Sequence, residues 1–479
     1  MSAHDLWTIE AMAAAMRATR SGSLPAGVSG LSIDSRTAAT GEAFFAIKGD
    51  SRDGHEFVAA ALAQGASLAV VSAARRDEFP QEAPLLVVDD VLKGLEDLAR
   101  AARSRSQARV AAITGSVGKT GSKEALRLAL SANGETHGSA ASYNNHWGVP
   151  LSLARFPASA RYGVFELGMN HAGELTPLTR LVRPHVAMVT TVEPVHLEYF
   201  GSVEAIADAK AEIFLGVEKG GAAVLNRDNG QYGRLERAAR AAGVSRIVTF
   251  GEHADAEARL VKAALQPDCS VVSANILGAD VTYKLGAPGR HIVMNSLGVL
   301  ATAVLLGADL ALAAVAQTQL RPPVGRGARS TLELSTGAAL LIDESYNANP
   351  ASMRAALDLL GRAPVGPRGR RIAVLGDMLE LGNESAALHR ALAQPVVALG
   401  IDLVFCSGPS MRALWDALPS ERRGAYAADS AALQPEVLGA VHDGDAIMVK
   451  GSLGSRMGPI VRALSALSSA NESRTRPSI

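Results

Sequence analysis

The sequence predicts an α/β protein of three domains, and three observations support this prediction. The chain has 479 residues, which is more than a single hydrophobic core usually supports. From residue 109 onward, short runs of Val, Ile and Ala alternate with helical segments, as in parallel sheets covered by helices. The basic stretch ARSRSQAR and the Pro/Gly-rich stretch RPPVGRGARS interrupt this pattern as a linker and a hinge. We therefore expect domains at residues 1–108, 109–328 and 329–479.

The first domain is expected to hold a substrate. Its strand-like runs LSIDS, AFFAI, LAVV and LLVV surround one helical stretch, residues 56–64. This region is too small and too poor in strands for a nucleotide-binding α/β domain, so a substrate-holding module fits better.

The second domain begins with the strand ARVAAIT, a Gly-rich turn and a helix from about Ser122. The strands RYGVFEL, HVAMVTTV, GAAVLN and RIVTF follow, separated by helices, which predicts a parallel sheet with helices on both faces. The apolar segment 297–316 is about long enough to span a bilayer. Because Asp309 and two glycines interrupt it, we expect two buried helices instead.

The third domain alternates again, with strands LLIDES, RIAVLGDM, DLVFCSG and DAIMVKGS, and predicts a second doubly wound sheet. It has no GxGxxG after its first strand, which argues against a dinucleotide site. Polar clusters follow its strands at 344–347, Asp377 and 450–452, where open α/β sheets bind ligands. The polar tail 468–479 predicts disorder.

Composition and charge exclude several function classes. Lys plus Arg and Asp plus Glu both total 47, so the formal net charge is zero, and we expect neither a nucleic-acid partner nor membrane insertion. Cys269 and Cys406 show neither metal spacing nor a disulfide framework, which predicts a reducing cytoplasmic location. The first 20 residues do not have the pattern of a signal peptide. We expect a monomer.

A phosphate-binding loop is the strongest chemical motif. It lies between a predicted strand and a predicted helix, where backbone N–H groups and the helix N-terminus attract phosphate oxygens. Its residues are Thr114, Gly115, Ser116, Val117, Gly118, Lys119 and Thr120. Lys119 is expected to contact the β- and γ-phosphates and the Thr120 hydroxyl to bind Mg²⁺. Ile113 replaces the first glycine of the long motif, so a Gly/Ser loop with an incidental lysine is the alternative.

Two further side chains at strand ends are candidate Mg²⁺ ligands. Glu166 ends RYGVFEL, and His196 follows VAMVTTV. Carboxyl ends of neighbouring parallel strands share one edge of a sheet, and Mg²⁺ takes few protein ligands. A helix-capping or surface role for Glu166 and a structural role for His196 are the alternatives.

Lys210 lies where an apolar residue is expected. In SVEAIADAKAEIFLGV it is four residues after Ile206 and three before Ile213, on the same helical stripe. Because desolvating an ammonium is costly, either the side chain extends to water or burial keeps the amine neutral for chemistry.

Three other segments contribute candidate binding residues. Asn144 and Asn145, in YNNHWGVP, form a turn that suits substrate or phosphate oxygens, although an ordinary turn has the same residues. Asn295 begins an apolar helix and either contacts an adenine edge or caps the helix. Arg326 lies on the predicted hinge, from which a cation reaches a γ-phosphate when domains close.

Taken in order, the motifs resemble those of the Mur ligases. They are TGSVGKT, YNNHWGVP, FELGMNHAGE, HLEYFGS with AKAEIF, PGRH followed by Asn295, DESYNANP, LGDMLELG and VKGS. The N-terminal segment IDSRTAATGEAFFAIKGDSRDGHEF is similar to the UDP-binding domain of that family, so the resemblance covers nearly the whole chain. YNANP and GDMLELG favour the member that adds D-alanyl-D-alanine over those that add L-alanine, D-glutamate or the third residue.

The resemblance implies a small α/β UDP-sugar-binding module, a central phosphate-loop ATPase domain with a parallel sheet, and a C-terminal Rossmann-like domain. It implies ATP-driven joining of D-Ala-D-Ala to a UDP-N-acetylmuramoyl-tripeptide through an acyl-phosphate, with Mg²⁺ as cofactor. The third residue of the tripeptide, meso-diaminopimelate or lysine, stays open.

The resemblance also implies roles for single residues. Lys119, Lys210 and His196 would act in catalysis, and Thr120, Glu166, His196 and a carbamylated Lys210 would hold the metal. Asn295 would contact adenine and Arg326 the γ-phosphate, and Glu344 falls where relatives usually have an Asp near the ribose. Ser35, Arg36, Asn144, Asn145, Tyr346 and Asn347 are the expected substrate contacts.

Three alternatives remain open from the sequence. One is a sister Mur ligase or a folylpolyglutamate-type ligase, and another is an inactive binding protein on this fold. The third is a phosphate-loop NTPase without ligase activity, although the sequence has no Asn-Lys-x-Asp guanine motif.

Overall fold

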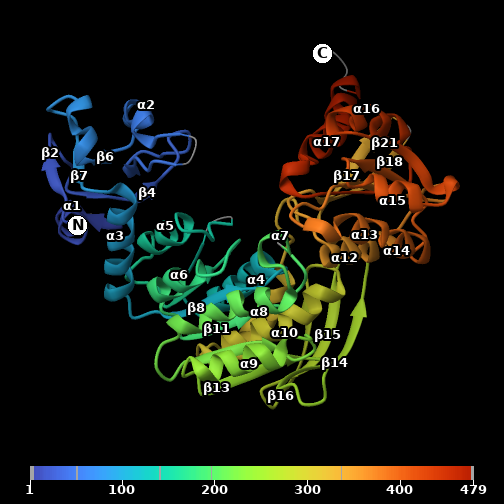
Figure 1. Ribbon diagram of the computed structural model, residues 1–479, viewed down its shortest axis with the longest axis horizontal. Helices are drawn as coiled ribbons and strands as arrows, with labels where there is room; N and C mark the ends of the chain where they lie inside the picture. Colours follow the sequence, from blue (N-terminus) through green and yellow to red (C-terminus); the bar gives the residue numbers. More distant parts are fainter. Residues whose placement is uncertain (1–4, 50–51, 140–141, 196, 336, 476–479) are drawn as a thin grey trace.

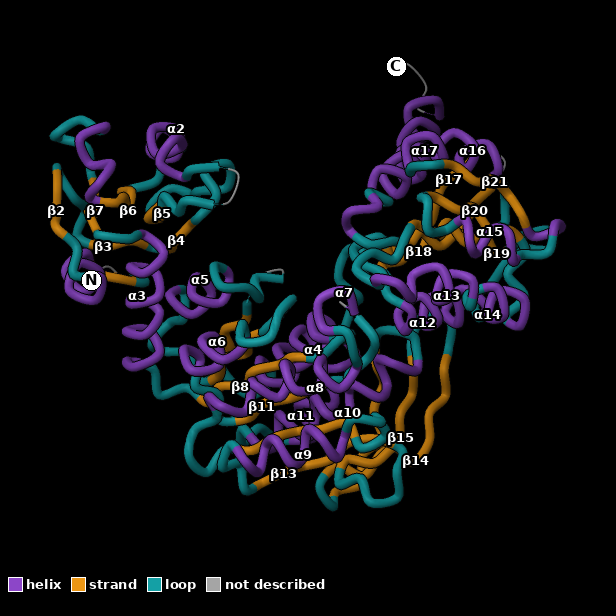
Figure 2. The backbone as a smooth tube through the Cα atoms, viewed as in Figure 1, coloured by secondary structure: helices purple, strands orange, loops and turns teal. Residues whose placement is uncertain are grey.

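The computed structural model describes residues 5–49, 52–139, 142–195, 197–335 and 337–475. Its main sheets lie in three successive parts of the chain, which we call the first, central and last regions, and which Figure 1 shows as blue, green-yellow and orange-red. The first and last regions lie at opposite ends of the central one (Figures 1 and 2). The structure is therefore α/β throughout, as predicted, while the domain limits at 108 and 328 stay predictions.

The first region has seven short strands, so the prediction that it is poor in strands is wrong. A five-stranded sheet has the order β2-β7-β6-β5-β4, and β1 and β3 form a separate antiparallel pair. Most of these strands have two to four residues, which is too short for an alternating sequence pattern. The elements are β1 (Trp7–Thr8), α1 (Ile9–Met16), β2 (Thr19–Ser21), β3 (Gly27–Val28), β4 (Gly30–Ser32), β5 (Glu42–Phe45), α2 (Val58–Ala63), β6 (Leu68–Ser72), β7 (Leu85–Val88) and α3 (Val91–Arg105).

The first half of the basic stretch predicted as a linker is helical, and the stretch is partly buried. Helix α3 continues to Arg105, and only residues 106–108 separate it from the next strand. Arg103 is buried and donates from Nε to the Val182 carbonyl at 2.8 Å. The Arg105 guanidinium lies 3.4 Å from the centroid of the Trp7 ring. Arg105 also donates from Nη2 to the Phe156 carbonyl at 3.5 Å, so both arginines connect the first region to the central one instead of facing water.

One hydrophobic core is shared by the first and central regions. It extends without interruption from Trp7 to Val244 and includes side chains of α1, α3 and the central helices. Trp7 also donates from Nε1 to the Ala154 carbonyl at 2.8 Å, in a buried position. The last region has two cores of its own. We therefore expect the first and central regions to behave as one body.

The central region contains a nine-stranded sheet of order β16-β15-β14-β13-β12-β11-β8-β10-β9. Pairing is parallel from β9 to β14 and antiparallel between β14, β15 and β16. The sequence prediction missed this antiparallel extension. The strands are β8 (Arg109–Thr114), β9 (Thr136–Gly138), β10 (Tyr162–Glu166), β11 (Val186–Val189), β12 (Ala222–Asn226), β13 (Arg246–Gly251), β14 (Ala258–Leu265), β15 (Ser270–Ile276) and β16 (Ala279–Leu285).

Helices cover both faces of the central sheet, as the alternating pattern predicts. Alternate residues of β8 point into different cores: Val110 and Ala112 into the core shared with the first region, Ala111 and Ile113 into a core with α4, α10 and α11. The helices are α4 (Lys119–Ser131), α5 (Gly148–Ala154), α6 (Leu175–Val182), α7 (Leu197–Phe200), α8 (Val203–Ala211), α9 (Tyr232–Ala241), α10 (Arg290–Leu305) and α11 (Leu310–Ala316). The apolar segment 297–316 thus forms parts of two helices, and no helix in the described ranges is long and apolar enough to cross a bilayer.

The last region contains a six-stranded sheet of order β17-β18-β22-β19-β20-β21, in which only β17 is antiparallel to its neighbour. The four predicted strands are present, and the edge strands β17 and β21 were missed. The elements are β17 (Ala328–Leu334), β18 (Gly337–Glu344), α12 (Pro350–Gly361), β19 (Arg371–Gly376), α13 (Ser385–Arg390), α14 (Ala393–Ala398), β20 (Leu403–Ser407), α15 (Arg412–Ala417), β21 (Arg423–Ala427), α16 (Ser430–Ala440), β22 (Ala446–Lys450) and α17 (Gly458–Thr475). Disorder from Ser468 is therefore wrong as far as Thr475.

Candidate active site

The phosphate loop connects β8 to α4 with the backbone shape that the motif requires. Gly115 has φ +148° and Gly118 has φ +84°, and Gly118 is the N-cap of α4. The helix begins at Lys119, three residues earlier than predicted, so its N-terminus faces the loop. Lys119 folds back and donates from Nζ to the Gly115 carbonyl at 2.7 Å. Helix N-terminus and ammonium thus both lie at this loop, an arrangement that suits an anion.

The remaining loop residues are held by the turn after β11. Ser116 donates from its backbone N–H to the Thr191 carbonyl at 2.8 Å and from Oγ to the Glu193 carbonyl at 3.0 Å. Thr190 Oγ1 donates to the Val117 carbonyl at 2.6 Å. Thr114 is fully buried at the end of β8. The loop is therefore fixed in shape before any ligand binds.

Gly115→Ala is expected to damage this loop severely. A Cβ at Gly115 would overlap Thr190 Oγ1, which is buried and already bonded to the loop, and φ +148° disfavours any L side chain. We expect the Kd for ATP to rise by at least about tenfold, since the loop must shift to relieve the overlap. Titration calorimetry measures this. Gly121→Ala is the control, because a Cβ there meets no atom within 4 Å; an unchanged Kd in Gly115→Ala would contradict the role of the loop.

Glu166 lies beside the phosphate loop on the neighbouring strand. It pairs in parallel register with Ile113 of β8 and its side chain is fully buried. Its Oε1 accepts a hydrogen bond from Asn144 Nδ2 at 2.7 Å, and its Oε2 has no partner among the described residues. The surface and helix-capping alternatives are therefore wrong. A buried carboxylate oxygen without a partner is costly, so this oxygen is a candidate ligand for a cation.

Thr120 is the second candidate oxygen ligand. It is buried in the first turn of α4, and its Oγ1 lies 3.5 Å from Ser142 Oγ. No group of three or more His, Cys, Asp and Glu with metal-ligand geometry occurs within the described ranges. A Mg²⁺ site with few protein ligands and several waters remains compatible with Thr120 and Glu166. His196 lies outside the described residues.

Lys210 is buried, with 2% of its surface exposed, so extension of the side chain to water does not account for it. It lies near the end of α8, which gives way to a 3₁₀ helix at Glu212–Gly216 instead of continuing to Val217 as predicted. Desolvation and, secondarily, the Lys119 cation hold the pKa of Lys210 well below its usual value. No ion pair or hydrogen bond of its ammonium occurs within the described part of the chain. The structure thus places a buried lysine, whose neutral form is favoured by its surroundings, within electrostatic reach of Lys119 in the phosphate loop.

Asn295 also lies against the phosphate loop. A Cβ at Gly118 would overlap Asn295 Nδ2, so only glycine lets these groups approach. The cap alternative is wrong, because α10 begins at Arg290 with Gly289 as its N-cap and Asn295 lies in the second turn.

Arg326 lies on the hinge, and Glu344 lies beyond it at the end of β18. The Arg326 guanidinium lies 4.2 Å from the centroid of the Tyr346 ring. Desolvation and the Arg326 cation lower the pKa of Lys119, while the Glu166 carboxylate acts in the opposite direction. Glu344 instead forms an ion pair with the buried Lys450, Oε2 to Nζ, at 3.2 Å. Phosphate loop, Glu166 and Arg326 are therefore close enough for their charges to interact.

Family models and relatives agree on one family. The Mur ligase middle domain matches residues 113–303, the Mur ligase glutamate ligase domain residues 331–453, and the Mur ligase family catalytic domain residues 27–103. The UDP-N-acetylmuramoyl-tripeptide–D-alanyl-D-alanine ligase of Escherichia coli is 35% identical over 436 residues, which cover 91% of this chain and 93% of that protein. The protein of the same name from Rickettsia prowazekii is 30% identical over 429 residues, covering 90% and 93%. The chain belongs to the Mur ligase family.

Solved structures have the same architecture as this Mur ligase. A crystal structure of MurF from Acinetobacter baumannii is 28% identical, covers 96% of this chain and 99% of that one, and gives a TM-score of 0.80. MurF ligase from Thermotoga maritima, solved in complex with ADP, is 23% identical with a TM-score of 0.74 and shares the fold. The predicted family and fold class are thereby confirmed.

The predicted substrate contacts of this Mur ligase are more dispersed. Arg36 is exposed and pairs with Asp34 at 2.6 Å in the first region. Asn145 accepts hydrogen bonds at Oδ1 from the Trp147 and Gly148 N–H groups and so shapes the turn before α5. Ser35 is half-buried beside Arg36 in the segment that follows β4, and Figure 1 shows β4 apart from α4, the helix that the phosphate loop precedes. Their role as substrate contacts stays a prediction.

Two residues of the site were not found from the sequence. Asp343 accepts the Gly325 N–H at 3.1 Å and the Ser345 Oγ at 2.6 Å, and so connects the hinge to the end of β18. Lys123 is fully buried on α4 and donates from Nζ to the Ser139 carbonyl at 2.7 Å. The signal for Lys123 was its position one helical turn after Lys119.

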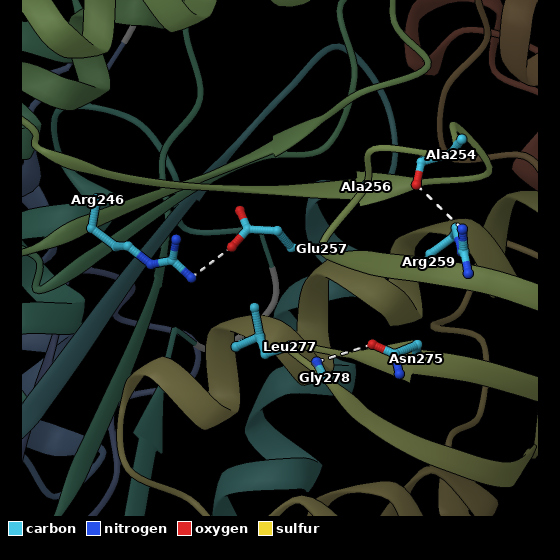
Figure 3. Close-up of a pocket in the computed structure, with 8 residues that line it drawn as sticks. All are labelled: Arg246, Ala254, Ala256, Glu257, Arg259, Asn275, Leu277 and Gly278. Carbon is cyan, nitrogen blue, oxygen red and sulfur yellow. Dashed lines mark hydrogen bonds and ion pairs between the residues drawn. The ribbon is translucent and has the colours of Figure 1, made fainter.

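A cavity of about 400 Å³ in this Mur ligase lies away from the phosphate loop, beside β13 and β14 (Figure 3). Strands β11 and β12 separate β13 from β8. Its cations are already partnered: Arg246 pairs with Glu257 at 2.7 Å, and Arg259 donates to the Ala254 carbonyl at 3.3 Å. This cavity therefore gives no reason to move the site from the phosphate loop.

Proposed function

We propose that this Mur ligase uses ATP to join D-alanyl-D-alanine to a UDP-N-acetylmuramoyl-tripeptide, which yields the UDP-muramyl-pentapeptide of peptidoglycan synthesis. The observation that supports this most directly is the match to relatives of that printed name over about 90% of both chains. The substrate-holding first region, the phosphate loop and the last region are all part of that match.

The chemistry follows from the poor reactivity of a carboxylate toward amines. Transfer of the ATP γ-phosphoryl group to the tripeptide carboxylate yields an acyl-phosphate and ADP. The dipeptide amine then attacks the acyl carbon, the amide bond forms, and inorganic phosphate leaves with the electron pair of the broken C–O bond. Water must be excluded meanwhile, because it would hydrolyse the acyl-phosphate.

This chain's own residues would bind and orient the phosphates. Lys119 and the loop N–H groups would hold the β- and γ-phosphates, and Asn295 would contact the adenine. Arg326 would stabilise charge that develops on the γ-phosphoryl oxygens. A contact of this kind contributes about 3 kcal/mol in comparable sites.

Mg²⁺ is the proposed cofactor, and the residues present suit it. Thr120 and Glu166 would hold it, together with His196 and a carbamylated Lys210. The buried, unpartnered Oε2 of Glu166 supports this assignment. When bound, the ion supplies charge neutralisation and alignment of phosphate oxygens.

A carbamate at Lys210, as proposed, would explain why this lysine is buried. A neutral amine can add CO₂ with loss of one proton, and the product is an anion with two hard oxygens. Burial lowers the pKa of Lys210 and so favours the neutral amine, and the Lys119 charge acts in the same direction. An anionic ligand would also offset the neighbouring cations.

The test is phosphate release over a matrix of UDP-muramyl peptides and amine acceptors. We expect phosphate release to require both a UDP-muramyl-tripeptide and D-Ala-D-Ala. The reason is that the chain has the first and last regions of this family as well as the phosphate loop. A coupled phosphate assay measures this, with the tripeptide ending in meso-diaminopimelate or lysine. Equal turnover with free D-Ala or L-Ala would exclude this ligase and favour a sister enzyme.

A further inference from the structure

Arg326 has no charged partner among the residues that the structure describes. Its backbone belongs to the hinge between Leu320 and β17, and its guanidinium is half-buried. In the described part of the chain its side chain forms no hydrogen bond and no ion pair. Its contact is the Tyr346 ring, at 4.2 Å from the guanidinium carbon to the ring centroid. A guanidinium over an aromatic face is attracted by the ring while its N–H groups, at the edge of the plane, stay free.

The ring itself is fixed through the backbone. Tyr346 donates its N–H to the Gly325 carbonyl at 3.0 Å, so the residue before Arg326 is bonded to the residue that carries the ring. Gly325 has φ +74°, and a Cβ there would lie 2.9 Å from Tyr346 Cβ. The chain therefore needs glycine here to bring hinge and ring together.

The sheet supports both sides of this contact. Asp343, near the end of β18, accepts the Gly325 N–H at Oδ2 and the Ser345 N–H at Oδ1, at 3.1 and 3.0 Å. Lys450, at the end of β22, donates to the Asn347 carbonyl at 2.9 Å. The residues on either side of Tyr346 are thus anchored to two neighbouring strands of the last region.

Arg326 has the chemistry of an anion ligand. A guanidinium whose N–H groups are not used by the protein can donate two of them to the oxygens of one phosphate. Among the described residues no acceptor takes the side-chain N–H groups of Arg326, so they are available to the γ-phosphate that the proposed function assigns to this residue.

We propose that Tyr346 is a positioning residue, whose ring sets the plane of the Arg326 guanidinium so that its N–H groups meet the γ-phosphate of bound ATP. This rests on the γ-phosphate role proposed above for Arg326. It replaces the direct substrate contact expected for Tyr346 from its motif. It also means that ring and guanidinium move with the last region as one unit.

Binding of two nucleotides separates the possible roles. ADP lacks the γ-phosphate, whereas the non-hydrolysable analogue AMP-PCP has it, and titration calorimetry with Mg²⁺ gives both Kd values without turnover. Tyr346→Leu should raise the Kd of AMP-PCP by about 5- to 30-fold, the range of a partly desolvated cation–π contact. Its Kd for ADP should change by less than about twofold. Tyr346→Phe keeps the ring and should restore AMP-PCP binding.

A double-mutant cycle with Arg326→Ala tests the connection between the two residues. If the ring acts through the guanidinium, Tyr346→Leu adds no further loss of AMP-PCP affinity once Arg326 is absent. Tyr426→Leu is the matched control, because Tyr426 also lies under an arginine, Arg412 at 5.4 Å, and belongs to β21, the edge strand of the last region farthest from β17 and the hinge. It should leave both Kd values unchanged.

Each outcome decides one statement. The positioning role of Tyr346 would be overturned if the double variant lost AMP-PCP affinity by the product of the two single losses. It would also be overturned if Tyr346→Leu lost as much affinity for ADP as for AMP-PCP. A normal AMP-PCP affinity in Tyr346→Leu beside a weakened one in Arg326→Ala would overturn it as well. A normal AMP-PCP affinity in Arg326→Ala would instead remove the γ-phosphate role from Arg326. A raised KM for D-Ala-D-Ala with unchanged nucleotide binding would return Tyr346 to the substrate site.

Discussion

Lys210→Ala is expected to abolish ligation, with kcat reduced by at least about 10²- to 10³-fold, the range for loss of one preorganised charge-stabilising group. ATP binding should largely survive, because Lys119 and the loop backbone hold the phosphates. Small carboxylic acids should restore some activity by occupying the place of the carbamate. Steady-state rates with and without acetate or propionate, and calorimetry with ATP, measure these effects.

The same group affects stability in a way that does not depend on turnover. Burial lowers the pKa of Lys210 in the folded protein, so the folded state binds fewer protons than the unfolded state. The destabilisation is absent above the unfolded pKa and grows as pH falls toward the lowered folded pKa. Carbamate formation would reverse this cost, so bicarbonate should raise the Tm of the parent protein and not that of Lys210→Ala.

Lys219→Ala is the matched control for Lys210, since Lys219 is an exposed lysine nine residues further along the chain. It should leave kcat, and the response of Tm to bicarbonate, unchanged. Full activity of Lys210→Ala without added acid would falsify the carbamate proposal. The low pKa of this buried amine would then need another explanation.

Glu166→Gln is expected to raise the Mg²⁺ concentration needed for half-maximal ligation by about tenfold or more and to lower kcat by about 10²-fold. The amide keeps the shape of the carboxylate but removes its charge and one oxygen ligand, and Oε2 is the atom without a protein partner. Electron paramagnetic resonance of Mn²⁺ with ADP gives the metal affinity without turnover.

Glu236→Gln serves as the control for that measurement, because Glu236 pairs with Arg240 at 2.8 Å on the surface of α9. It should not change the metal affinity. If Glu166→Gln retained the parent's Mg²⁺ dependence and Mn²⁺ affinity, Glu166 would not be a metal ligand. Its burial would then be explained by Asn144 alone.

The parts of the site that were predictable are those set by local rules. A phosphate loop needs only a strand, two flexible glycines and the start of a helix. Residues 114–120 could therefore be predicted from the local sequence alone. Lys210 was recognisable because a lysine on an apolar stripe breaks helical periodicity. Family and fold class followed from the order of several such motifs, and the relatives confirm them.

What was missed depends on contacts between distant segments. From the sequence, Arg103 is expected at the surface. It is buried because carbonyl oxygens near Val182, far along the chain, accept the hydrogen bonds of its guanidinium. Strands β14 and β16 have exposed and buried residues in broken alternation, so the hairpins that they form with β15 lacked a clear strand pattern. The stacking of Tyr346 on Arg326 joins residues 20 apart through a glycine turn, and no local pattern in the sequence encodes it.

The core that runs from Trp7 to Val244 has a thermodynamic consequence for catalysis. The entropy of orienting the first region on the central one is lost once, during folding, and not again in each catalytic cycle. The free energy of ligand binding then has to orient only the last region relative to the other two. That region is connected to them by residues 321–327 and a few contacts beside them. The last region, with Arg326 at its hinge, would therefore have to be oriented again in every catalytic cycle, whereas the first region would not.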